Sequence, residues 1–188
     1  LSSVKVPTQK AADRPSLFME IRQPDNSYIF IPSTTSESRL YIPMGFFDKD
    51  TIANNSGHLV LNASLFHFGI LTSIIHMAWM RAVAGRLESR YRYSADIVYN
   101  NFIWPEQVSD VQKAEIEKLA QEILDARANY PDATLADLYD PLTMPPDLAK
   151  AHKALDKAVD KLYQKEPFTN DSERVALLFN LYQHKNNA

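Results

Sequence analysis

One apolar stretch constrains the fold more than any other part of the chain. Its apolar residues recur at helical spacing, which predicts a single helix from about Ser64 to Val83. Gly85 follows after Ala84 and tolerates the left-handed backbone that often ends a helix. A helix that is apolar on most sides must be buried, so we expect the core to form around it. His76 and Trp79 lie inside the stretch, and we interpret both as core residues.

Short segments with strand character surround this helix. The turn signal Pro24-Asp25-Asn26-Ser27 predicts a hairpin between the first two of them. The expected strands are Leu17–Gln23, Tyr28–Ile31, Arg39–Pro43 and His58–Leu61, with a further edge strand within Tyr91–Phe102. Their close spacing favours antiparallel pairing.

The last part of the chain has helical periodicity and recognisable helix starts. Helix-capping pairs occur at Ser109 with Gln112, Thr134 with Asp137, and Asn170 with Glu173. Pro146 suits the first turn of another helix. We therefore expect a helical bundle after residue 105.

The fold class expected is α+β: a small antiparallel sheet packed on a long buried helix, followed by an all-α C-terminal helical bundle. Trp104-Pro105-Glu106 marks the predicted boundary, which gives two domains, residues 1–104 and 105–188. Composition changes there as well. The first part has ten Lys and Arg against eight Asp and Glu, and the second has ten against fifteen. Arginine dominates the cations of the first part and lysine those of the second.

Arginines gather where the buried helix is predicted to end. They are Arg81, Arg86, Arg90 and Arg92, with Tyr91 and Tyr93 interleaved, and Arg39 follows the Ser/Thr loop from Ser33 to Ser38. Ser89, Ser94, Asn100 and Asn101 accompany them. The arginine fork suits phosphates and guanine edges, and short polar side chains bind phosphates and bases. All eleven are candidate DNA-binding residues. Two alternatives stay open: the cations form a solvated face, and the tyrosines pack on the sheet.

No pattern for catalysis or for a cofactor is present. The chain has no cysteine, no G-x-G or G-x-x-x-x-G-K-[ST] sequence, and no metal spacing among its five histidines. It also has no apolar run long enough for a membrane span and no signal peptide pattern. We therefore expect no catalytic residue, cofactor site, metal site or membrane partner in this chain, and a cytoplasmic location.

Several segments, taken in their order along the chain, together resemble one family of enzymes. They are RLYIPMGF, FGILTSIIHMAWMRAVAGRLESRYRYS, IVYNNFIWPE, IEKLAQEILDAR, LADLYDPLTMPPDLAKAHKALDKAVDKLY and ERVALLFNLY. From about residue 15 to its end, the chain resembles the C-terminal part of the MmeI-like restriction–modification enzymes. These are large bacterial DNA methyltransferases, many of which are fused to a nuclease.

The resemblance implies a target recognition domain followed by a helical C-terminal domain. The parent would be an S-adenosylmethionine-dependent, adenine-N6-specific DNA methyltransferase. The family's catalytic N-P-P-[FY] motif and its cofactor-binding glycine motif are absent here, and the chain begins with Leu1. We therefore expect a fragment that recognises double-stranded DNA, binds the catalytic domain of its own parent chain, and neither methylates nor cuts. The alternative is a helical docking module for a protein partner, with the arginines as a solvated rim.

Overall fold

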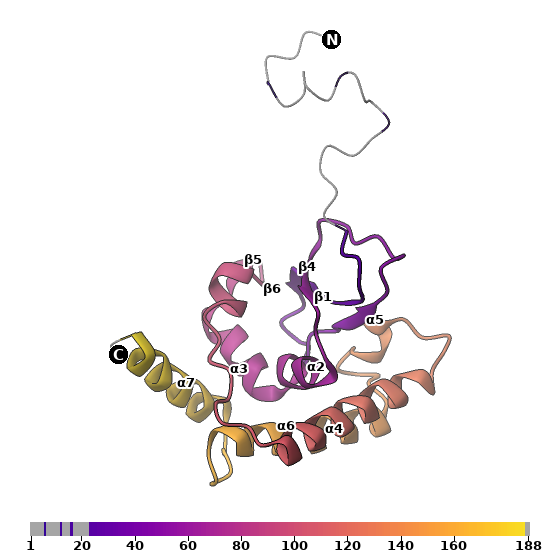
Figure 1. Cartoon of the computed structure of the whole chain (residues 1–188). Helices are drawn as coiled ribbons and strands as arrows, with labels where there is room; N and C mark the ends of the chain where they lie inside the picture. Colours follow the sequence, from indigo (N-terminus) through magenta and orange to yellow (C-terminus); the bar gives the residue numbers. More distant parts are fainter. Residues whose placement is uncertain (1–5, 7–11, 13–15, 17–22, 187–188) are drawn as a thin grey trace.

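The computed structural model describes residues 23–186 and the single positions 6, 12 and 16 (Figure 1). The fold is α+β, as predicted, with short strands first and helices after them. Of the predicted strand Leu17–Gln23, all but Gln23 lies outside the described residues, and Gln23 is not in a strand.

The first sheet has the strand order β3-β1-β4, and all of its pairs are antiparallel. Its strands are β1 (Tyr28–Pro32), β3 (Gly45–Phe47) and β4 (Gly57–Leu61). The predictions of Tyr28–Ile31 and His58–Leu61 as strands are confirmed. The prediction of Arg39–Pro43 as a strand is wrong, and β3 follows it instead. Pro43 has no amide hydrogen to donate to a neighbouring strand. The Ile42 amide donates to Met77 Sδ at 3.4 Å, so it does not pair with a strand either.

The second sheet has the order β2-β6-β5, with β2 (Thr34–Thr35), β5 (Gly85–Leu87) and β6 (Arg90–Arg92). The predicted strand within Tyr91–Phe102 is confirmed only at its start, and its predicted place at an edge is wrong, because β6 lies between β2 and β5. After β6 the chain forms a π-helical turn, η1 (Ala95–Tyr99). Trp79 Nε1 donates to the Val98 carbonyl at 3.0 Å, and this bond holds the turn against the helix that carries Trp79.

The predicted single helix is two helices, α2 (Leu65–Thr72) and α3 (Ile74–Val83). Ser73 separates them with extended backbone, and its hydroxyl donates to the Ile70 carbonyl at 2.6 Å. The prediction of a left-handed end at Gly85 is also wrong. Ala84 ends α3 in an extended conformation, and none of the chain's four glycines has a positive φ. Gly85 instead begins β5.

The C-terminal helices begin where the sequence predicts. They are α4 (Asp110–Ala128), α5 (Leu135–Leu138), α6 (Pro146–Tyr163) and α7 (Asp171–Asn186). Ser109 and Thr134 form reciprocal capping boxes with Gln112 and Asp137, and the Glu173 amide donates to Asn170 Oδ1 at 3.0 Å. Local capping pairs therefore set these helix starts.

One apolar core runs through both parts of the chain. Figure 1 shows α4 and α6 side by side beneath α2, and α7 alongside α3. Buried residues of α2 and α3 join those of α4, α6 and α7 in a single cluster. At Gly69 of α2, an added Cβ would lie only 2.7 Å from Ile116 Cγ2 of α4. The absence of a side chain at Gly69 thus permits close contact between the two parts.

Candidate nucleic-acid interface

The two-stranded hairpin of β5 and β6 carries the most exposed cations of the predicted cluster. Arg86 pairs with Tyr91 and Leu87 with Arg90 across the hairpin, which leaves only Glu88 and Ser89 in the turn. Glu88 has a φ of 56°, as the first turn position of a tight hairpin requires. All residues from Gly85 to Arg92 are exposed except Tyr91, so the hairpin presents its side chains to solvent.

Arg86 is held within the hairpin itself. Its guanidinium carbon lies 3.7 Å from the centroid of the Tyr91 ring, and its Nη1 donates to the Ser89 carbonyl at 2.7 Å. A longer ion pair of 3.7 Å reaches Glu37. These contacts restrain the Arg86 side chain and close the turn over Ser89.

Arg90 and Arg92 point away from the core, because alternate residues of a strand face opposite sides. Arg90 forms an ion pair of 2.8 Å with Glu88 in the adjoining turn. Arg92 lies between Gly85 and Thr34 of the neighbouring strands. Within residues 23–186 it has no ion-pair partner. To bind an anion, Arg90 must therefore break its ion pair with Glu88, whereas Arg92 has no ion pair to break within the described residues.

A polar turn lies close to the hairpin, and its residues are not among those predicted from the sequence. The Ser33 amide donates to the Ser56 carbonyl at 2.8 Å, and the Tyr93 amide donates to the Ser33 carbonyl at 2.8 Å. These bonds connect the exposed turn Asn54-Asn55-Ser56 to the end of β6. The run Asn-Asn-Ser-Gly is a sequence signal for such a turn, but nothing local shows its closeness to the arginines.

Arg81 and Arg39 do not join the hairpin cations. Arg81 Nη2 binds Asp171 at 2.7 Å and its Nη1 donates to the Leu40 carbonyl at 3.1 Å, with the side chain only 19% exposed. Arg39 Nη2 donates to the Ala136 carbonyl at 3.3 Å. Both side chains connect the first part of the chain to the helical part.

Tyr93 lies in the core with a 2% exposed surface, and Tyr91 is 8% exposed beneath Arg86. His76 Nδ1 donates to the Leu71 carbonyl at 2.7 Å, so its Nε2 accepts from the Tyr93 hydroxyl at 3.2 Å. Burial raises the pKa of Tyr93, which keeps the hydroxyl protonated for this bond. His76 and Trp79 are both buried, in agreement with their interpretation as core residues.

The remaining predicted residues surround η1. Ser94 precedes the turn, and its carbonyl accepts from the Val98 amide at 2.8 Å. Asn101 Nδ2 donates to the carbonyls of Asp96 and Ile97 at 2.7 and 3.1 Å, so Asn101 ends the turn. Asn100 is exposed. Of the eleven predicted residues, the hairpin brings together Arg86, Ser89, Arg90, Tyr91 and Arg92.

Two family models match the chain, "MmeI, target recognition domain" over residues 1–106 and "MmeI, C-terminal domain" over residues 108–188. The chain belongs to the MmeI family. DNA methyltransferase A of Bacillus subtilis (strain 168) is 45% identical over 176 residues, which make up 94% of this chain and 20% of that protein. A solved structure of the Type IIL restriction-modification enzyme MmeI in complex with DNA is 47% identical, with a TM-score of 0.92. The match covers 100% of this chain and 25% of that one.

In this MmeI-family chain, the hairpin falls within the part matched by the target recognition domain. The chain spans a fifth to a quarter of the length of the relatives named above. Among the residues that the structure describes, no group of three or more His, Asp or Glu residues is placed to hold a metal ion. No helix in the described ranges is both long and apolar enough to cross a membrane.

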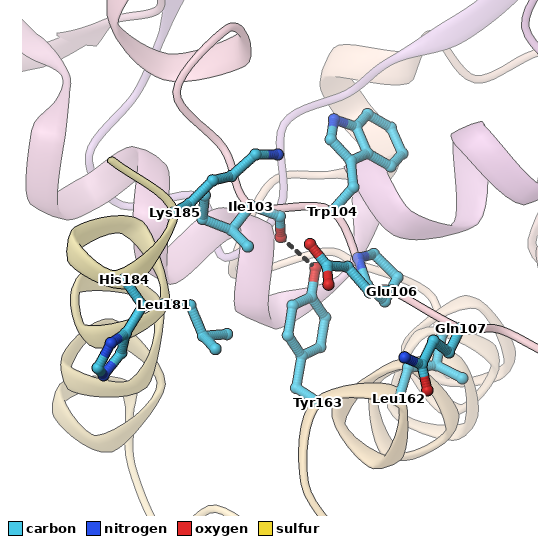
Figure 2. A pocket seen from close by; sticks show the side chains of 10 residues that line it. Ile103, Trp104, Glu106, Gln107, Leu162, Tyr163, Leu181, His184 and Lys185 are labelled. Atoms are coloured by element: carbon cyan, nitrogen blue, oxygen red, sulfur yellow. Dashed lines mark hydrogen bonds between the residues drawn. The ribbon is translucent and has the colours of Figure 1, made fainter. Parts of the chain in front are cut away.

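One pocket of the MmeI-family chain lies where residues 103–107 meet α6 and α7, away from the hairpin residues. It measures about 560 Å³ and is lined by Trp104, Glu106, Tyr163, Leu181 and Lys185, among others (Figure 2). The Tyr163 hydroxyl donates to the Ile103 carbonyl at 2.8 Å at its floor.

Proposed function

We propose that this chain recognises a DNA sequence for a site-specific, adenine-N6-specific DNA methyltransferase of which it is a part. The observation that carries the proposal is the exposed arginine hairpin inside the region matched by the target recognition domain. The relatives are a DNA methyltransferase and a restriction-modification enzyme solved with DNA. Double-stranded DNA and the parent's catalytic domain are the proposed partners. A cytoplasmic location stays a prediction.

The shape of the hairpin suits the major groove. A two-stranded β-ribbon fits into that groove, where each base pair shows a distinct pattern of donors and acceptors. Arg90 and Arg92 are the side chains proposed to bind phosphates or guanine edges, and Ser89 at the tip is a hydrogen-bonding group. Arg86 would act mainly by holding the turn. The turn Asn54–Ser56 adds amide and hydroxyl groups beside them.

The chemistry of methyl transfer belongs to another part of the parent. S-adenosylmethionine would supply the methyl group, but the residues described do not fit it. The four glycines are not in a glycine-rich turn, and none has a positive φ. Enzymes that modify a base extrude it from the stack, which requires the duplex to be held in register. This chain is proposed to provide that register.

The test uses the full-length parent. A variant with Arg86, Arg90 and Arg92 all replaced by Ala should bind duplex DNA weakly and methylate it slowly at moderate salt. Its logarithmic salt dependence should be shallower, by about 0.9 for each phosphate that the variant no longer neutralises. The matched control replaces Lys153, Lys157 and Lys161, three exposed lysines on one face of α6, and removes the same charge.

Normal binding and methylation by the arginine variant would contradict the proposal. Equal losses in both variants would assign DNA binding to overall charge instead of to the hairpin. If the native parent bound a protein but no DNA, the chain would be the docking module that the sequence left as an alternative.

A further inference from the structure

Helix α3 has no side-chain cap of its own at its first turn. Ser73 precedes it, but the Ser73 hydroxyl is directed back to the Ile70 carbonyl of α2. The cap comes from α6, where Asp156 Oδ1 accepts the Ile74 amide at 2.7 Å. The other oxygen, Oδ2, accepts from the Tyr41 hydroxyl at 2.6 Å. A carboxylate at a helix start binds an otherwise unsatisfied amide and interacts favourably with the helix dipole.

The last turn of α3 is also held by a carboxylate of the C-terminal part. Arg81 binds Asp171, the first residue of α7, and the Leu40 carbonyl. Between the two ends, Trp79 packs against Phe179 and Tyr182 of α7, with ring centroids 5.2 and 6.4 Å apart. Figure 1 shows α7 running beside α3. Helix α3 is thus attached to the C-terminal helices along its length.

The end of α3 leads straight into the arginine hairpin. Only Ala84 separates Val83, the last residue of α3, from Gly85, the first of β5, and its amide still bonds to the Met80 carbonyl at 2.8 Å. With one residue between them, the direction of α3 sets the direction of β5. Any tilt of the helix would therefore move Arg90 and Arg92 relative to a bound duplex.

We infer that Asp156 and Asp171 are positioning residues for DNA recognition, because they fix both ends of the helix that orients the hairpin. The inference rests on the proposed function of the hairpin. It gives the C-terminal helices a defined part in sequence discrimination without any DNA contact of their own. A small displacement of the hairpin side chains weakens hydrogen bonds to base edges, which depend on direction, more than it weakens the electrostatic attraction to phosphates. Loss of either carboxylate should therefore reduce discrimination more than overall affinity.

The first test uses Asp171→Ala in the full-length parent, because this variant leaves Arg81 Nη2 no acceptor at position 171. Asp171 is 44% exposed, so the variant is expected to fold. The probe is a duplex library with a randomised central segment, and poly(dI-dC) measures non-specific binding. Enrichment of the preferred sequence over its single-base variants should fall about threefold or more. Binding to poly(dI-dC) should change less than about twofold. Glu173→Gln removes the same charge close by in the first turn of α7 and should preserve enrichment, because the Glu173 carboxylate accepts hydrogen bonds from Thr169 and Asn170 and not from Arg81.

The second test concerns Asp156. Asp156→Asn keeps an oxygen for the Ile74 amide and should retain enrichment, whereas Asp156→Ala removes the cap and should reduce it. Binding is measured well below each variant's unfolding temperature, so that loss of fold cannot account for the change. If Asp156→Ala fails to fold, Asp171→Ala alone tests the inference.

Native enrichment in Asp171→Ala would overturn the inference. If the native parent enriches no sequence, the proposed function fails and the inference fails with it. If the triple arginine variant loses enrichment while Asp171→Ala and Asp156→Ala keep it, only the inference fails.

Discussion

Arg86 covers the ring of its cross-strand neighbour Tyr91, with 3.7 Å between the guanidinium carbon and the ring centroid. The contact helps to bury Tyr91, which is 8% exposed and belongs to the apolar core cluster. It also leaves the Arg86 Nη1 directed at the Ser89 carbonyl in the turn. One side chain therefore holds both the strand pair and the tip of the hairpin.

A double-mutant cycle measures this contact. Arg86→Met and Tyr91→Leu should show a coupling free energy of about 0.5–1 kcal/mol, the usual value for an exposed cation–π pair. Urea unfolding of the two single variants, the double variant and the native chain gives the quantity. Additive losses would mean that the two side chains do not support each other.

Replacement of Arg92 should weaken DNA binding more than replacement of Arg90. Arg90 must release its 2.8 Å ion pair with Glu88 before it can bind DNA, so its net gain is smaller. We expect about a tenfold loss of affinity for Arg92→Ala, which is within the range for one directional arginine contact. Arg90→Ala should lose less, and Glu88→Gln should strengthen binding. Fluorescence anisotropy at constant salt compares the variants, with Lys157→Ala as the control; the reverse order for Arg90 and Arg92 would contradict the expectation.

The stability of the chain should fall as the pH is lowered from about 6.5 to about 4. Burial lowers the pKa of His76 to about 4 and that of His152 to about 3. In this pH range both histidines therefore bind a proton in the unfolded chain but not in the native state. Asp156 opposes this effect, because burial raises its pKa to about 6 and the native state gains that proton first. The net difference of roughly one proton corresponds to about 1.4 kcal/mol for each pH unit.

Urea midpoints measured at several pH values across this window test the dependence. His152→Gln should flatten it, because one histidine then remains to balance Asp156. Gln183→Ala changes an exposed residue of α7 that does not titrate and should leave the slope unaltered. A native midpoint that does not change between about pH 6.5 and pH 5 would contradict the expectation.

Gly69→Ala should destabilise the chain although alanine favours helix formation. The new methyl group would lie 2.7 Å from Ile116 Cγ2 and 3.4 Å from Ala120 Cβ, so α2 and α4 would have to separate. Overpacking of this kind costs about 1–3 kcal/mol, and the helical gain of about 1 kcal/mol offsets only part of it. Gly85→Ala meets no atom within 4 Å and should be nearly neutral. Equal urea midpoints for the two variants would exclude a tight contact at Gly69.

Sequence patterns predicted those features whose partners lie close together in the chain. The capping boxes at Ser109 and Thr134 join residues three positions apart, and the structure has both. The break at Ser73 could not be predicted in this way. Asp156, which caps the second helix, lies 82 residues beyond Ile74. The apolar periodicity continues across Ser73 and therefore predicts one unbroken helix. The Ile74 amide that the break leaves without a helical partner is satisfied by Asp156, which is far away in sequence.

The same distinction between contacts that are local and contacts that are distant in sequence applies to the candidate site. Arg86, Arg90 and Arg92 are grouped because they are neighbours in sequence, but the sequence patterns did not predict the hairpin of β5 and β6 that carries them. The partner of Arg81 is 90 residues away in α7, so the sequence could not separate Arg81 from the hairpin cations. The closeness of Asn54–Ser56 to β6 likewise depends on strand pairing through Ser33.

The close approach of α2 and α4 at Gly69 also bears on how such proteins can be recombined. Their shared core crosses the point where the two family models meet, between residues 106 and 108. A chimaera joined there would bring together helix surfaces that were never selected to fit each other. Transfer of a recognition specificity to a relative should therefore succeed either by exchange of the exposed hairpin side chains alone or by transplantation of the sheets together with all the helices that follow.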